Sequence, residues 1–305
     1  MEQIEEKSGE KTEEKFLAFV EEARRRIERK IGKEGTVEKN IVRKNNGVNL
    51  TGLTIRERGC NVCPTIYMNS LYENFLEGES MDAITECVWN IYLKRRMEQN
   101  VNMGFWDDFQ KAKDRIVYKL VNRRKNEELL TKIPYVAFLD LAVCFYYLLD
   151  HEALGRGSIL IYRSQMEKWN VSLEELSRIA SKNTRELLPA EMLSLSDLIK
   201  DAEMEGEEET ILREFRIWSN NRRTQGAAVM LYPEILKETA KEWGDFYILP
   251  SSVHEIIFLK KTNCREVEYL KKMVKEVNDT QVEPEEILSY EVYWYNSKEE
   301  KLGIA

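Results

Sequence analysis

Residues 246–260 read FYILPSSVHEIIFLK, and they predict two β-strands joined by a short polar loop. The apolar stretches at its two ends, 246–249 and 256–260, are rich in aromatic and β-branched residues, which favour strands. Pro250 restricts one backbone angle and two serines follow it, as is common in turns. We therefore predict a pair of strands whose connection carries polar side chains.

The segments around this pair predict a sheet with helices. Two further strands are expected at 214–219 and 226–231, and a last one in YEVYWYN (290–296). A helix is expected between Pro233 and Gly244, and another after Asn263, where Glu266 completes a capping pattern. Repeated strand–strand–helix order predicts a mostly antiparallel sheet with helices on one face.

The first two thirds of the chain give a similar mixture. Apolar residues at helical spacing predict helices at 13–31, 80–97 and 172–188, the last two beginning at serine caps. Asn46-Gly47 predicts a β-hairpin turn, and the changed apolar phase after it predicts a bulge at Thr51-Gly52. A strand is expected at 114–121, with a helix as the alternative, and another strand in the buried stretch FLDLAVCFYYLL (138–149).

The acidic segment DAEMEGEEET (201–210) has almost nothing apolar to bury and predicts an exposed linker. The fold class expected is α+β, with mostly antiparallel sheets covered by helices in two lobes. The predicted divisions are a polar tail and helix at 1–32, one α+β lobe at 33–200, the linker, and a second α+β lobe at 211–305.

Composition excludes some classes of function. The chain has 305 residues, 43% of them hydrophobic, and a net charge of -8, which opposes broad binding to nucleic acid. The acidic start lacks the basic and apolar parts of an export signal. The longest apolar run, 136–149, contains Asp140 and is too short for a membrane helix. We expect a cytoplasmic protein without membrane contact, whose cysteines are thiols.

Several phrases in order resemble one family. They are KNNGVNLTGL (44–53), PTIYMN (64–69), KDRIVYKLVN (113–122), IPYVAFLDLA (133–142), NTRELLP (183–189), GAAVMLYPEIL (226–236), DFYILPSSVHE (245–255) and MVKEVNDTQVEPEEILS (273–289). Together they resemble domain of unknown function 5688, over about Asn40 to Ser289. The resemblance implies a bacterial protein of unassigned activity, and it brings no catalytic residues.

The candidate site is the loop between the two opening strands. Ser251, Ser252, His254 and Glu255 offer hydroxyls, an imidazole and a carboxylate on a rigid support, which is typical of a binding surface. An alternative is a hydrolase in which His254 activates Ser252. A turn that satisfies its own backbone is the simplest interpretation.

Other motifs are incomplete. Cys60 and Cys63 have the spacing of half a zinc site, but no second pair completes the four ligands, so no metal is predicted. Phe258 stands where a zinc-protease signature needs its second histidine. Gly155-Arg156-Gly157 lacks the third glycine of a dinucleotide loop, and no cofactor is predicted.

Two kinds of partner remain open. Arginine-rich clusters could form a nucleic-acid surface if they met on one face, although such a partner is disfavoured; they lie at 24–26, 94–96, 123–125 and 222–223. Tyr290, Tyr293, Trp294 and Tyr295 could serve a protein partner or self-association if the last strand lies at an edge. No complete catalytic constellation is present, which favours a binding or interaction protein over an enzyme.

Overall fold

The computed structural model describes residues 2–97, 100–151, 154–193, 214–261 and 266–305. The chain forms two compact units, one of residues 1–44, 48–103 and 151–155, the other of 45–47, 104–150 and 156–305. The segment 201–210 lies outside the described residues, so the linker stays a prediction. The strands on either side of it, β8 (Ala190–Leu193) and β9 (Phe215–Asn220), pair with each other inside the second unit.

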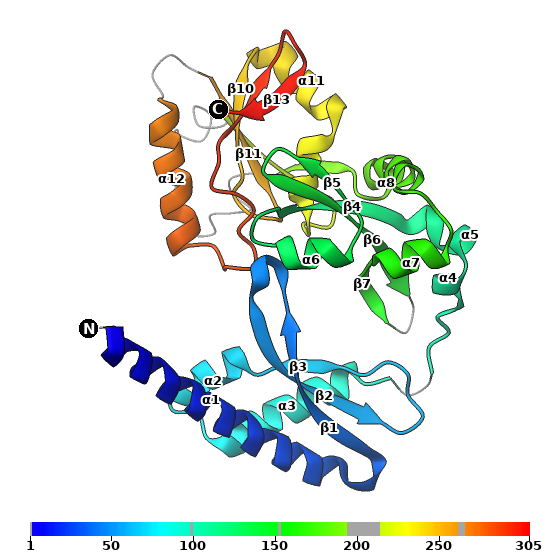
Figure 1. The fold of residues 1–305 in the computed structure, drawn as a ribbon, viewed down its shortest axis with the longest axis vertical. Helices are drawn as coiled ribbons and strands as arrows, with labels where there is room; N and C mark the ends of the chain where they lie inside the picture. Colours follow the sequence, from blue (N-terminus) through cyan, green and yellow to red (C-terminus); the bar gives the residue numbers. More distant parts are fainter. Residues whose placement is uncertain (1, 98–99, 152–153, 194–213, 262–265) are drawn as a thin grey trace. The chain divides into compact units, whose positions relative to one another are not determined.

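The first unit is a small α+β unit in which helices pack on an antiparallel sheet. Its antiparallel sheet has the order β1 (Gly35–Arg43), β2 (Asn49–Glu57), β3 (Thr65–Tyr67). Its helices are α1 (Glu2–Ile31), α2 (Asn69–Leu76) and α3 (Met81–Arg95) (Figure 1). Val20 and Ile27 of α1 pack with Ile84 and Val88 of α3 in a shared core. These contacts confirm the amphipathic pattern predicted for both helices.

The hairpin turn is confirmed, because Asn46 and Gly47 have φ of 58° and 74°. The bulge predicted at Thr51-Gly52 is wrong, since β1 and β2 pair without interruption from Gly35↔Glu57 to Arg43↔Asn49. Residues 51–55 are all buried, so both faces of β2 are covered at this point. The apolar phase changes because both faces are buried, and no extra residue is needed to explain it.

The second unit contains two sheets. In the smaller one, β6 (Leu141–His151) pairs with β4 (Ile116–Asn122), β5 (Tyr135–Phe138) and β7 (Gly155–Leu160). The stretch predicted as one buried strand is thus the end of β5, a reversal at Leu139 with φ of 52°, and most of β6. The helices beside it are α4 (Gly104–Asp107), α5 (Phe109–Ala112), α6 (Glu127–Lys132), α7 (Arg163–Lys168) and α8 (Leu173–Leu187). Ser172 caps α8, as predicted, by accepting the Glu175 N–H at 3.1 Å.

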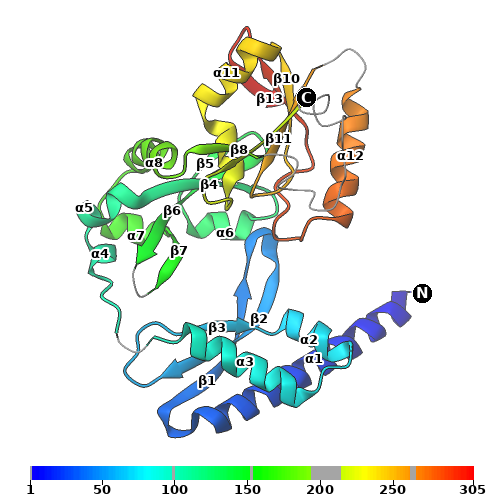
Figure 2. The same cartoon turned by 180° about the vertical axis from the view of Figure 1, so that it is seen from behind.

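The larger sheet is antiparallel throughout, in the order β13 (Lys301–Ile304), β12 (Tyr293–Asn296), β10 (Phe246–Leu249), β11 (Ile256–Lys260), β9, β8. Helices α11 (Pro233–Trp243) and α12 (Val267–Thr280) lie on opposite sides of β10 and β11 (Figure 2). Phe246 and Ile248 pack on the α11 side, and Tyr247 and Leu249 on the α12 side. The α+β class is therefore confirmed, whereas helices cover both faces rather than one.

One strand prediction is wrong. Residues Gly226–Leu231 form a 3-10 helix, η4, in which the first five residues are buried. The sequence GAAVML is apolar at every position, so it has no period that distinguishes a strand from a helical turn. Its place in the core, packed against β9 and β11, decided its conformation.

The last predicted strand is β12, and it is not an edge strand, because β13 pairs with it. Tyr293 and Tyr295 are buried in the core, and Tyr290 lies before the strand with its hydroxyl donating to Asp279 at 3.0 Å. Trp294 is half-buried. Self-association through these residues stays a prediction, without the edge position from which it was argued. Among the described helices, none has the length and apolar character needed to cross a bilayer.

Candidate functional site

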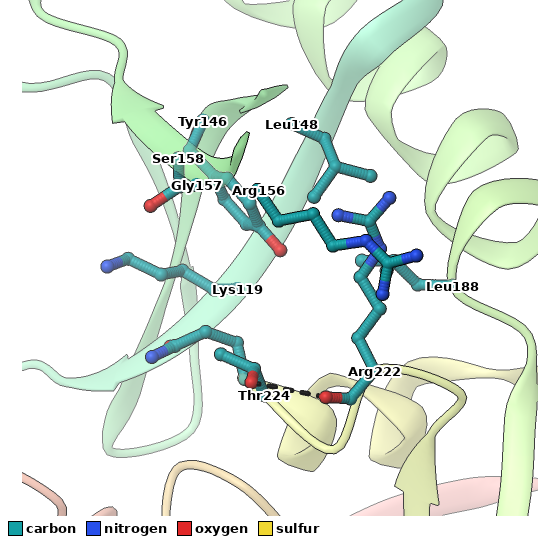
Figure 3. Close-up of a pocket in the computed structure, with 10 residues that line it drawn as sticks. Lys119, Tyr146, Leu148, Arg156, Gly157, Ser158, Leu188, Arg222 and Thr224 are labelled. Carbon is teal, nitrogen blue, oxygen red and sulfur yellow. Dashed lines mark hydrogen bonds between the residues drawn. The ribbon is translucent and has the colours of Figure 1, made fainter. Parts of the chain in front are cut away.

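A cavity of about 240 Å³ opens in the second unit beside the smaller sheet (Figure 3). It is lined by side chains of β4, β6 and β7, by the C-terminal end of α8 and by the loop that follows β9. The lining residues are Lys119, Tyr146, Leu148, Arg156, Gly157, Ser158, Leu188, Arg222, Thr224 and Gln225. Three of them are cationic and, within this lining, none is acidic.

The pairing of β4 with β6 brings Lys119 to the cavity. Lys119 lies opposite Cys144, and Val117 opposite Tyr146, so these four side chains share one face of the sheet. The alternate residues of β4, such as Tyr118, point to the other face and pack in the main core. A single lysine is thus set among apolar neighbours on the face that lines the cavity.

The loop Asn220–Gln225 supplies the opposite wall, and Asn220 holds its shape. The Asn220 side chain accepts the Arg222 N–H at 2.9 Å and donates to the Thr224 carbonyl at 2.8 Å. Arg223 and Gln225 have φ of 51° and 55°, a left-handed conformation that costs free energy in residues other than glycine. Such strain persists where the surroundings enforce it, and it is common at binding sites.

The three cationic side chains of the cavity differ in whether a described carboxylate lies close to them. Arg222 donates to Asp150 at 3.2 Å, and Arg115 approaches the same carboxylate oxygen at 4.0 Å. Neither Lys119 nor Arg156 has a carboxylate partner in the described part of the chain. Arg156 is exposed and Lys119 is half-buried. Among the described residues, therefore, no carboxylate neutralises the charges that Lys119 and Arg156 bring to the cavity.

Burial shifts the pKa values of three side chains on β4 and β6, those of Lys119, Cys144 and Tyr146. Burial lowers the pKa of Lys119, because desolvation disfavours the ammonium form. Burial raises the pKa of the Cys144 thiol, to about 12, and of the Tyr146 hydroxyl, also to about 12. The nearby Arg222 opposes the rise at Tyr146. Tyr146 is accordingly a neutral hydrogen-bond donor at physiological pH, and Lys119 loses its proton more readily than an ordinary lysine.

Replacing Lys119 with methionine is expected to stabilise the unliganded protein by about 1 kcal/mol, or roughly 2–4 °C in Tm. The variant removes, from a half-buried position, a charge that has no carboxylate partner among the described residues, and it keeps a side chain of similar volume. Because the folded-state pKa of Lys119 lies below its ordinary value of 10.5, the gain is full below the folded pKa and declines as pH rises toward 10.5.

Thermal denaturation at neutral pH and at about pH 10 measures this gain and its decline. Lys182→Met is the matched control, because the Lys182 side chain is 72% exposed and its removal should leave Tm unchanged. A loss of Tm in Lys119→Met would show that the ammonium contributes to stability, contrary to this expectation.

Comparison with known proteins gives a family and no activity. The sequence profile of the Family of unknown function (DUF5688) matches residues 16–297, nearly the whole chain. This chain belongs to DUF5688. No curated protein and no solved structure matches it significantly. The site must therefore be interpreted from its own geometry.

In this DUF5688 protein the predicted loop residues form one hydrogen-bonded turn. The Ser252 hydroxyl donates to Glu255 at 2.8 Å and that of Ser251 to the same oxygen at 3.3 Å. Ser252 Oγ also accepts the His254 backbone N–H at 2.9 Å. The four residues are brought together, and these contacts are those of a turn that satisfies its own polar groups.

The His254 imidazole bonds away from the serines. Its Nδ1 accepts the Gln225 backbone N–H at 3.3 Å, and its Nε2 lies 3.3 Å from Glu286. Nδ1 as acceptor places the proton of a neutral ring on Nε2. His254 thus supports the loop end that lines the cavity, since Gln225 is one of the lining residues. Use of Ser252 and His254 as a binding or hydrolytic site stays a prediction.

The other motifs have local partners. Cys60 donates weakly to the Met97 carbonyl at 3.2 Å, and Cys60, Cys63, Cys87 and Cys144 are free thiols. Within the described residues, no group of three or more His, Cys, Asp or Glu side chains is placed to hold a metal ion. The clustered Arg24 and Arg26 pair with glutamates of α1, and Arg96 pairs with Glu57.

Sequence reasoning noticed parts of the cavity without joining them. It treated Arg156 as part of an incomplete glycine loop and Arg222 as one member of an arginine cluster, and it missed Lys119. The signal for Lys119 was present: a single charge inside the strand IVYKLVN (116–122), otherwise apolar up to its terminal Asn122. A lysine in such a strand needs either a partner or a cavity.

Proposed function

We propose that this protein binds a small anionic molecule, with a phosphate as the favoured anionic group, in the cavity lined by Lys119, Arg156 and Arg222. The observation that carries the proposal is that these cations, from β4, β7 and the loop after β9, line one cavity whose described lining includes no acidic residue. The proposal specifies the ligand of the binding protein expected from the sequence.

The arginines suit an anion in particular. A guanidinium presents several N–H donors in a plane that matches the oxygens of phosphate or carboxylate. The guanidinium groups of Arg156 and Arg222 point to the same part of the cavity (Figure 3). Arg222 reaches Asp150 with one nitrogen at 3.2 Å and so keeps donors for a ligand. An anion there would gain the hydrogen bonds that Arg156 lacks within the described structure.

The remaining lining is suited to a ligand with a short organic part. Leu148 and Leu188 give an apolar surface, and Tyr146, Ser158 and Thr224 give hydroxyl groups. Pockets that combine an apolar wall with a few polar groups orient small molecules.

The free thiols of the described cysteines support placing this function in the bacterial cytoplasm, a reducing compartment.

Replacing Arg156 with alanine is expected to weaken phosphate binding at least about tenfold, because a charge-assisted hydrogen bond contributes roughly 1.5–3 kcal/mol. Titration calorimetry of the full chain with inorganic phosphate measures the affinity. A parallel titration with succinate tests whether a carboxylate binds in its place. The wild-type Tm should also rise with added phosphate, since a ligand that binds only the folded state stabilises it.

Arg178→Ala is the matched control, because Arg178 is exposed on α8 and does not line the cavity. It should bind phosphate like the wild type. Wild-type protein that shows no binding of either anion up to about 10 mM would refute the proposed function. Equal weakening in Arg156→Ala and Arg178→Ala would show general charge attraction instead of a site.

A further inference from the structure

Lys119 has the setting of a reactive amine. It is half-buried on β4, it lines the cavity, and it faces Cys144 across the strand pair rather than a carboxylate. A lysine used only to attract an anion works best at an exposed position, where its charge costs little. Burial next to apolar groups instead lowers the pKa of Lys119, because desolvation disfavours the ammonium form relative to the neutral amine. A neutral amine is a nucleophile.

The cavity separates this amine from the arginines. In Figure 3 the Lys119 side chain points to one side, and the guanidinium groups of Arg156 and Arg222 lie toward the other. A ligand whose anionic group contacts the arginines would extend its other end toward Lys119. Ser158 and Tyr146 also line this space and supply hydroxyl donors.

We propose that Lys119 forms an imine with a small phosphorylated aldehyde or ketone held by Arg156 and Arg222. This inference rests on the proposed function and names the class of ligand for the same cavity. The arginines bind the phosphate and thereby hold the carbonyl carbon near the amine. Such positioning raises the effective concentration of the carbonyl group at Lys119 above that at any exposed lysine.

The step is a condensation without a redox change. The lone pair of the neutral Lys119 Nζ forms a bond to the carbonyl carbon, and the C=O π electrons move to oxygen. The oxygen then leaves as water with the two amine hydrogens, and the carbon–nitrogen double bond replaces the carbon–oxygen double bond. A neutral Tyr146 hydroxyl can donate a hydrogen bond to the carbonyl oxygen during the attack.

The test traps the imine on the full-length protein. Wild-type protein is incubated with limiting glyceraldehyde 3-phosphate and sodium cyanoborohydride, which reduces an imine to a stable secondary amine, and peptides are mapped by mass spectrometry. Labelling at Lys119 is expected to exceed labelling at the exposed Lys182 by about tenfold. Uncharged glyceraldehyde, which lacks the phosphate, should show no such preference, and inorganic phosphate should compete with the phosphorylated aldehyde.

Two variants separate the roles. Lys119→Arg keeps a cationic side chain in the cavity but cannot form the imine, so it should lose the adduct at position 119. Arg156→Ala should keep the amine and lose the preference for the phosphorylated aldehyde. Wild-type protein that binds phosphate but is labelled no more at Lys119 than at Lys182 would overturn the imine and leave the proposed function standing.

Two other outcomes would also overturn the proposal or part of it. Absence of both phosphate binding and selective labelling would overturn the imine and the proposed function together. Selective labelling of Lys119 by glyceraldehyde as strong as that by glyceraldehyde 3-phosphate would overturn the phosphorylated class of ligand, because the arginines would then contribute nothing to the reaction.

Discussion

Replacing Gly226 with alanine is expected to lower the free energy of unfolding by about 3 kcal/mol, the upper end of what overpacking a core costs. A Cβ at this position would lie 2.2 Å from Ser219 Oγ, 2.4 Å from the His254 carbonyl oxygen and 2.8 Å from the Asn220 nitrogen. Two of these atoms belong to the backbone, and Ser219 is itself buried and donates to the His254 carbonyl at 2.7 Å. Moving the Ser219 hydroxyl would break its hydrogen bond to the His254 carbonyl, and moving the two backbone atoms would separate β9 from the turn that holds His254.

The same variant should also weaken phosphate binding, because Gly226 follows Gln225 directly in the loop that lines the cavity. Urea denaturation and phosphate titration measure the two effects. Gly303→Ala is the matched control, since a Cβ there meets nothing within 4 Å, and it should change stability by less than about 0.5 kcal/mol. A Gly226→Ala protein as stable as the Gly303→Ala protein would show that this close approach is relieved at no cost.

Replacing Asp140 with alanine is expected to destabilise the protein by about 2–3 kcal/mol, because hydrogen bonds to a charged group are strong and a buried donor loses its acceptor. The Asp140 carboxylate accepts from the Tyr293 hydroxyl at 2.8 Å and from the Ser289 hydroxyl at 2.6 Å. Tyr293 has 0% exposure, so water cannot replace the lost acceptor. Burial raises the pKa of Tyr293 well above 10.0, which keeps the hydroxyl protonated as the donor.

Urea denaturation of Asp140→Ala, Tyr293→Phe and the double variant tests this cluster. Both single variants remove the same hydrogen bond, so the double variant should cost less than the sum of the two single costs. Tyr293→Phe should be the milder change, because Asp140 is only half-buried and keeps its bond to Ser289. Strictly additive costs would show that the two side chains do not depend on each other.

Features that depend on neighbouring residues followed from the sequence. The caps at Ser80 and Ser172 each accept an N–H three residues later, as their positions predicted. Gly244 ends α11 with φ of 71°, and Asn46-Gly47 turns the hairpin, because few residues tolerate positive φ. These contacts span only a few residues, so a short stretch of sequence contains everything that decides them.

Sequence reasoning failed where burial removed the pattern. Residues 226–231 and 51–55 are buried almost throughout, so neither stretch has the regular change between apolar and polar positions that identifies a strand and its faces. When an element is covered on all sides, its apolar residues follow its environment and not its period. For the same reason, the sequence predicted helices on one face of the larger sheet, whereas helices cover both faces.

The candidate site divides in the same way. The sequence by itself determined the α+β class and the turn of Ser251, Ser252 and His254, whereas Lys119 was missed although it is the one charge inside an apolar strand. Only the tertiary structure decided that Lys119, Arg156 and Arg222 line one cavity, whose described lining has no acidic residue, and that His254 supports its loop. Strand pairing and loop packing join segments that are far apart in the chain, and charge compensation depends on those distant neighbours, which no local pattern records.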